Sequence, residues 1–182
     1  MKNIKLPIKG EVYPIPGKPV CLGEVIEIQK EVEEIRKKVI GGAIAIESLI
    51  ESLITIALFP EDKGKMRLFS DIVLSREQFS FMMKWKVLSD LTKANPIFTD
   101  SKETIKNLGG AIENIITYRN AFAHGTVVFR DKVPHLRYFK GKVIEKEVDD
   151  NFLSQIEKDF HKTHELLQEL YSDIHKKVKG ET

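Results

Sequence analysis

The chain has little cysteine and almost no net charge, and only the scarcity of cysteine restricts the classes of protein to which it can belong. Cys21 is its only cysteine, so no disulfide can form within the chain, which favours a reducing compartment. Charged residues make up 31% of the chain, yet the formal net charge is only +2. The total charge therefore argues neither for nor against a nucleic acid as partner, and a nucleic-acid site would need a local basic patch.

The sequence also lacks the patterns that mark most enzyme classes and most secreted or membrane proteins. It has no glycine-rich phosphate loop, no G-x-S-x-G turn and no zinc-ligand spacing, so we expect neither a cofactor nor a metal. Residues 1–19 contain no apolar signal-peptide core. The most apolar run, residues 39–59, has Glu47 and Glu51 in its middle, where a carboxylate is costly in lipid. We therefore expect a cytoplasmic protein that does not span a membrane.

The chain does have enough apolar residues for one folded core, with 42% hydrophobic residues in a length of 182. Proline and glycine punctuate residues 1–22, which predicts an extended N-terminal arm. Residues 23–178 are predicted to form a single helical domain.

Apolar residues spaced three and four apart predict a long first helix between about Gly23 and Phe59. Pro60 ends this pattern, because proline cannot continue a helix. Gly41-Gly42 lies inside the stretch, and it either kinks the helix or splits it in two.

Three more helical segments follow, at about residues 66–74, 79–91 and 105–124. Ser75, with Gln78 three residues later, has the spacing of a capping box and predicts the start of the second segment. Asp100 or Ser101 can cap the third segment. Gly125 is expected to stop the third segment by adopting the left-handed conformation.

The hydrophobic period changes between Thr126 and Val148. Short β-prone runs at residues 127–129, 135–139 and 143–144, separated by turn-forming pairs, predict a two- or three-stranded meander. Asp149 or Asp150 then caps a last amphipathic helix. The predicted fold is all-α: an antiparallel bundle of four or more helices, with a small β-hairpin or meander inserted at about residues 126–148.

The end of the helix at residues 105–124 carries the polar side chains that packing explains least. It reads Arg119-Asn120-Ala121-Phe122-Ala123-His124-Gly125. Asn120 and His124 are four apart and share a ridge of the helix. Arg119 lies about 140° around the helix from His124, given 3.6 residues per turn. These two side chains therefore meet if the arginine curls back, or if a second copy of the segment faces the first across a two-fold axis.

A purely structural role is the alternative for these residues. A histidine in the last helical turn before a glycine is a common C-terminal cap, and it interacts favourably with the helix dipole. An arginine one turn earlier is often a solvated charge. The asparagine, the small and aromatic spacer and the glycine occur together here, and this combination favours a functional site.

The segment from Arg119 to His124 resembles the motif of the HEPN superfamily of small α-helical domains: an arginine, a polar residue that is often asparagine, and then a histidine. The organisation of the helices over about residues 24–175 is similar to that family. The resemblance implies a homodimer and, in many members, metal-independent endoribonuclease activity in defence or stress response. Other members are non-catalytic modules that bind RNA, a nucleotide or a protein partner. A toxin–antitoxin branch has a tyrosine two residues after the histidine, where this chain has Thr126.

In an endoribonuclease of this kind, the three motif residues would share the chemistry. The 2′-hydroxyl of RNA loses a proton as it attacks the phosphorus, and the 5′-oxygen gains one as it leaves. His124 is the acid–base candidate, because imidazole titrates near neutral pH. Arg119 would bind the phosphate and stabilise its growing charge, and Asn120 would orient the histidine or the phosphate. The expected partners are RNA and a second copy of the chain.

Other polar and aromatic residues have both a functional and a structural interpretation. Glu47 and Glu51, four apart on the most apolar helix, either face the motif or mark the solvent or interface side of that helix. His161 and His164 share helical spacing but have no third ligand nearby, which favours surface histidines over a metal site. Tyr118 either stacks on a base or packs within the protein.

Overall fold

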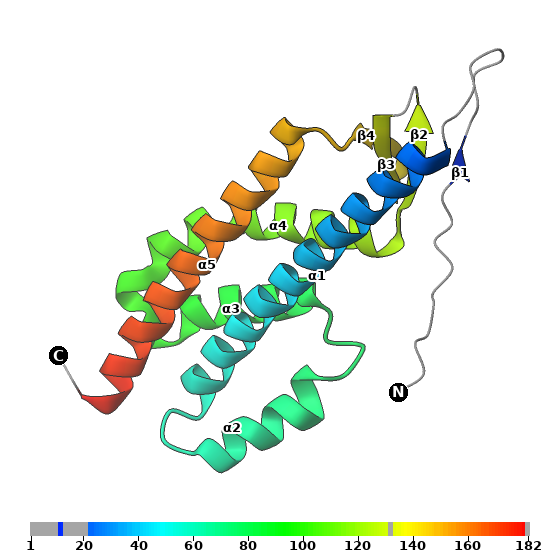
Figure 1. The fold of residues 1–182 in the computed structure, drawn as a ribbon. Coiled ribbons are helices and arrows are strands. Elements are labelled where there is room, and N and C mark those ends of the chain that lie inside the picture. Colours follow the sequence, from blue (N-terminus) through cyan, green and yellow to red (C-terminus); the bar gives the residue numbers. More distant parts are fainter. Residues whose placement is uncertain (1–10, 13–21, 131–132, 181–182) are drawn as a thin grey trace. The chain divides into compact units, whose positions relative to one another are not determined.

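A computed structural model of the chain describes residues 11–12, 22–130 and 133–180. Within these residues the protein is mostly helical, and a small sheet precedes the last helix (Figure 1). The helices are α1 (Leu22–Leu58), α2 (Lys63–Phe69), α3 (Phe81–Ala94), α4 (Lys102–His124) and α5 (Asp150–Lys179), with a π-helical turn η1 (Ser70–Leu74) and a 3-10 helix η2 (Pro96–Ser101). The predicted N-terminal arm lies outside the described residues, apart from Glu11, Val12 and Leu22.

The chain divides into two compact units. Unit 1 combines Met1–Ile40 with Tyr118–Ile156, and unit 2 combines Gly41–Thr117 with Glu157–Thr182. The boundary falls inside α1, α4 and α5, each of which is a continuous helix. Gly41-Gly42 therefore does not split the first helix, although the division between the units occurs at this glycine pair.

Unit 2 contains an apolar core to which four long helices contribute. Fully buried side chains come from α1, α3, α4 and α5, and they include Ile50, Leu88, Ile112 and Leu167. A Cβ at Gly42 would lie 2.9 Å from a ring carbon of Phe160, so this glycine makes room for the aromatic ring. The predicted apolar stripes thus do form one shared core in this unit.

The start of α3 differs from the predicted capping box. Ser75 closes η1, and its hydroxyl donates a hydrogen bond to the carbonyl of Asp71 at 2.5 Å. The N-cap of α3 is Ser80, whose hydroxyl accepts a hydrogen bond from the backbone N–H of Met83 at 3.4 Å. The prediction that Ser75 and Gln78 begin this helix is therefore wrong, because the preceding turn uses Ser75 for its own closure.

The segment before α4 is the 3-10 helix η2, with Asn95 as its N-cap. The Asn95 carboxamide accepts from the backbone N–H of Ile97 at 3.1 Å and donates to the carbonyl of Ala57 at 2.9 Å. Asp100, one of the two predicted caps of α4, pairs with Lys177 at 2.8 Å. This helix therefore begins next to the predicted residues, but Asn95 organises the turn that leads into it.

The sheet lies in unit 1 and has the strand order β1-β2-β3-β4. Its strands are β1 (Glu11–Val12), β2 (Thr126–Arg130), β3 (Val133–Lys140) and β4 (Lys142–Glu147). The antiparallel meander of β2, β3 and β4 confirms the predicted insertion before the last helix. Parallel pairing of β1 with β2 was not predicted from the sequence. Gly141 has a φ of +71° and forms the tight turn between β3 and β4.

Residues Ile26–Leu58 of α1 are long and apolar enough to cross a membrane by length and composition alone. The same properties belong to the core helices of folded domains. In unit 2, Ile46, Ile50 and Leu53 of this helix are buried in the shared core.

Candidate functional site

Arg119, Asn120 and His124 lie on the last two turns of α4, within unit 1. Asn120 and His124 are exposed, and Arg119 is half-buried. A guanidinium nitrogen of Arg119 donates to the side-chain oxygen of Asn120 at 3.0 Å. Across the part of the chain that the structure describes, no hydrogen bond or ion pair engages the His124 imidazole. The structure thus joins the arginine to the asparagine and leaves the imidazole accessible.

Aromatic contacts fix the buried face of this part of α4 within unit 1. Phe122 is fully buried and stacks on Phe152 of α5, with ring centroids 6.5 Å apart. Tyr118 meets the same Phe152 ring edge-on at 5.9 Å. This contact supports the packing interpretation of Tyr118. Because these rings determine which side of the helix is buried, Asn120 and His124 are held on its exposed side.

The end of α4 differs from the prediction at Gly125. Among the described glycines, only Gly141 and Gly180 have a positive φ, so the predicted left-handed stop at Gly125 is wrong. The Gly125 N–H donates to the carbonyl of Ala121 at 2.7 Å, and the chain enters β2 directly afterwards. A Cβ at Gly125 would lie 2.3 Å from the Ala121 oxygen and 3.0 Å from the Arg137 oxygen. Glycine is needed here because two backbone segments approach closely, and not for a left-handed turn.

Arg36 of α1 lies at the C-terminal end of α4 in unit 1, and no pattern in the sequence pointed to it. Its guanidinium donates to the Gly125 carbonyl at 3.3 Å and to a Glu33 carboxylate oxygen at 3.0 Å. A cation at a helix C-terminus interacts favourably with the helix dipole. Arg36 therefore occupies the capping role that the structural alternative assigned to His124. The two bonded residues are 89 positions apart, so no local sequence pattern connects them.

We expect Arg36→Met to lower the free energy of unfolding by about 1 kcal/mol, because it removes a cation and a donor from the end of α4. Urea denaturation followed by circular dichroism measures this change. The matched control is Lys37→Met, which removes an exposed cation from the same helix and should cost less than about 0.5 kcal/mol. Equal losses in the two variants would show that Arg36 does not stabilise the helix end.

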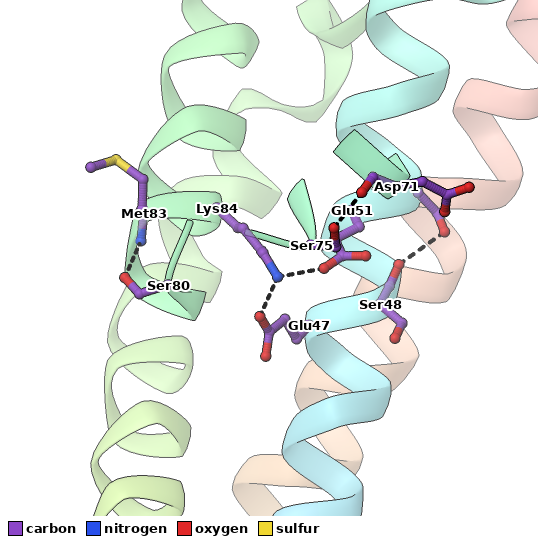
Figure 2. Close-up of polar contacts among 9 residues, drawn as sticks. Glu47, Ser48, Glu51, Asp71, Ser75, Ser80, Met83 and Lys84 are labelled. Carbon is purple, nitrogen blue, oxygen red and sulfur yellow. Dashed lines mark hydrogen bonds and ion pairs between the residues drawn. The ribbon is translucent and has the colours of Figure 1, made fainter. Parts of the chain in front are cut away.

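A second polar cluster, Lys84 with Glu47 and Glu51, lies in unit 2. Figure 2 shows the Lys84 side chain of α3 pointing between the two carboxylates of α1. Its ammonium donates to Glu47 and to Glu51, at 2.5 Å in each case. The Lys84 side chain is only 7% exposed, and the two carboxylate side chains are 22% and 24% exposed. The polar side of α1 in this region therefore faces a buried cation on α3.

The protonation state of Lys84 follows from two opposing effects. Burial alone would lower the pKa of Lys84, but the hydrogen bonds and charges of Glu47 and Glu51 outweigh it, so the pKa lies above its ordinary value of 10.5. Because the folded-state pKa is raised, the stabilisation is complete below pH 10.5 and is lost only as the pH rises through the folded-state pKa. Lys84 is therefore a charged structural group at neutral pH.

The predicted surface histidines of α5 have different environments. His161 is exposed and pairs with Glu165 at 3.1 Å, whereas His164 is half-buried. Within the described ranges, the structure contains no group of three or more histidine, cysteine, aspartate or glutamate side chains that could hold a metal ion.

The candidate site therefore consists of Arg119, Asn120 and His124, with Arg36 bound to the carbonyl at the end of the helix. A guanidinium oriented by an amide can offer parallel donors to a phosphate, and an accessible imidazole can give or take a proton. Comparison with protein-family models, with curated proteins and with solved structures finds no match to this chain.

Proposed function

We propose that the protein is a metal-independent endoribonuclease of HEPN type, which acts in the cytoplasm as a homodimer in defence or stress response. Its scaffold in this proposal is a single antiparallel helical bundle. One observation carries the proposal: Arg36 contacts the carbonyl at the α4 end and buried aromatic rings pack against this helix, whereas the exposed His124 has no hydrogen bond or ion pair in the described part of the chain. An exposed imidazole on the same helix end as a guanidinium that is bonded to an amide fits catalysis at a phosphate.

The proposed reaction uses two histidines and no metal. His124 of one subunit removes the proton of the RNA 2′-hydroxyl, and the 2′-oxygen then forms a bond to the adjacent phosphorus. The bond from phosphorus to the 5′-oxygen breaks, and the protonated histidine of the second subunit gives its proton to that oxygen. Arg119, oriented by Asn120, stabilises the charge that grows on the phosphate. The products are a 2′,3′-cyclic phosphate and a free 5′-hydroxyl.

A second copy of the chain belongs to this proposal because one α4 helix does not bring the Arg119 and His124 side chains together. Arg119 and His124 are about 140° apart around the helix, given 3.6 residues per turn. Arg119 is hydrogen-bonded to Asn120, on the exposed side of α4. A two-fold partner with the same patch supplies both the second imidazole and a second guanidinium.

The test is incubation of the purified protein with single-stranded RNA in the presence of EDTA. We expect cleavage that leaves cyclic phosphate ends, identified by mass spectrometry, and a dimeric molar mass by light scattering. The matched control is the same oligonucleotide with 2′-deoxyribose throughout, which should remain intact because the attacking hydroxyl is absent. RNA that is bound but not cut would contradict the proposed activity and favour a non-catalytic RNA-binding module. A monomer would contradict the shared site.

A further inference from the structure

The turn between β3 and β4 in unit 1 exposes an aromatic side chain among cations. Phe139 is 74% exposed, and Val143, its partner in the strand register, is 59% exposed. Lys140 and Lys142 flank the turn and are also exposed. The tight turn at Gly141 keeps these side chains at one end of the hairpin. Two adjacent apolar side chains in water are unfavourable for the isolated fold, which points to a binding role.

This turn is also the most basic part of the sheet. From Arg137 to Ile144 the chain has three cations and no carboxylate. The next residue, Glu145, accepts hydrogen bonds from Arg130, and this contact holds the pKa of the Glu145 carboxyl below its usual range. The carboxylate that follows the turn in the sequence is thus bonded to Arg130 of β2. The turn is the kind of local basic patch that the low net charge of the whole chain does not reveal.

The turn and the motif lie at the same end of the sheet, within unit 1. β2 begins at Thr126, two residues after His124, and Thr126 is paired with Arg137 of β3. β3 continues beyond this pair to Lys140, so the turn extends past the start of β2 on the side where α4 enters the sheet. The Arg137 carbonyl lies 3.0 Å from the Cβ position of Gly125, next to His124. A nucleic-acid strand bound at His124 therefore passes close to the β3–β4 turn.

We propose that the β3–β4 turn, formed by Arg137, Phe139, Lys140, Lys142 and Val143, binds single-stranded RNA beside the phosphate on which His124 acts. This inference rests on the proposed function. The Phe139 ring stacks on a base, and the cations contact the neighbouring phosphates. Stacking of bases on aromatic side chains is tolerant of sequence, and the cations add a salt-dependent attraction.

Two other occupants fit the turn less well. A stable protein interface covers roughly 800 Å² on each partner and has an apolar centre with few charges. The exposed residues of the turn include only Phe139 and Val143 as apolar side chains, beside the cations Arg137, Lys140 and Lys142. Single-stranded RNA matches both the cations and the exposed aromatic ring, because it is a polyanion with accessible aromatic bases. A second copy of the chain or a membrane surface matches only one of these two features.

The test measures RNA affinity in a His124→Ala background, so that the RNA is not cut during the experiment. The probe is a short fluorescein-labelled oligouridine, followed by fluorescence anisotropy. Phe139→Ala is expected to weaken binding roughly tenfold, Phe139→Leu by a similar factor, and Phe139→Trp very little, because only the aromatic ring stacks. The control is Leu68→Ala, which removes a side chain that is 58% exposed in unit 2 and should leave affinity unchanged. Lys142→Ala should lower the slope of log affinity against log salt by about 0.7.

Unchanged affinity in Phe139→Ala, or full affinity in Phe139→Leu, would overturn the proposal. It would equally be overturned if Phe139→Ala dissociated a dimer, or abolished binding to anionic vesicles, while RNA affinity stayed the same. The outcome is separable from the proposed activity. If RNA binding depends on Phe139 but the wild-type protein does not cleave RNA, the binding role of the turn is supported and the proposed activity is contradicted. If the protein cleaves RNA and substitutions of Phe139 have no effect, the activity is supported and the binding role of the turn is contradicted.

Discussion

His124→Ala is expected to slow RNA cleavage by roughly 10²- to 10⁴-fold, the contribution typical of a positioned acid–base group. The effect should be confined to catalysis, because His124 is exposed and the end of α4 is held by Arg36 and by buried rings. The free energy of unfolding should change by less than about 0.5 kcal/mol, and the dimer should persist. Single-turnover cleavage in EDTA, urea denaturation and light scattering measure the three quantities.

The matched control is His161→Ala, which removes another exposed histidine and should cleave at the wild-type rate. Mixed dimers give a sharper result. If the two proton transfers need one imidazole from each subunit, a dimer with a single His124→Ala chain should be about as slow as the doubly substituted dimer. Wild-type cleavage by purified His124→Ala would exclude the proposed mechanism, and a mixed dimer with half the wild-type rate would exclude the sharing of one site.

Lys84→Ala is expected to lower the free energy of unfolding by about 3 kcal/mol, because it leaves two largely buried carboxylates without their shared cation. Glu47 and Glu51 would then repel each other across one turn of α1. The loss should be similar at any pH between about 6 and 9, since the pKa of Lys84 lies above its ordinary value and Lys84 is charged throughout that range. Urea denaturation at several pH values measures it.

Two variants distinguish the effect of removing a buried charge on the free energy of unfolding from the effect of removing any lysine. Lys86→Ala removes an exposed lysine from the same helix and should cost less than about 0.5 kcal/mol. The triple variant Glu47→Gln, Glu51→Gln, Lys84→Met removes all three charges and should recover much of the loss, because uncharged groups carry no large penalty for burial. A cost below about 1 kcal/mol for Lys84→Ala would show that the two ion pairs contribute little to the stability of the fold.

Local patterns in the sequence were sufficient for the main elements of the fold. The apolar spacing of the first helix predicts α1 almost to the residue, since a helix buries one continuous stripe. The turn-forming pair Lys140-Gly141 correctly separates β3 from β4, because a tight hairpin needs a residue that tolerates a positive φ. The capping box at Ser75 failed, since a serine hydroxyl can bond backward to a carbonyl as readily as forward to an N–H group.

The candidate residues themselves were identified from the chain, because residue type and helical spacing place Asn120 and His124 on one ridge of a helix. The tertiary contacts around these residues could not be predicted from the sequence. Arg36 meets the end of α4 only after α1 and α4 have packed, and the pairing of β1 with β2 joins segments more than a hundred residues apart. Gly125 shows the physical reason: a Cβ there would lie 2.3 Å from the local Ala121 oxygen and also 3.0 Å from the Arg137 oxygen, and only the folded chain supplies the second of these neighbours.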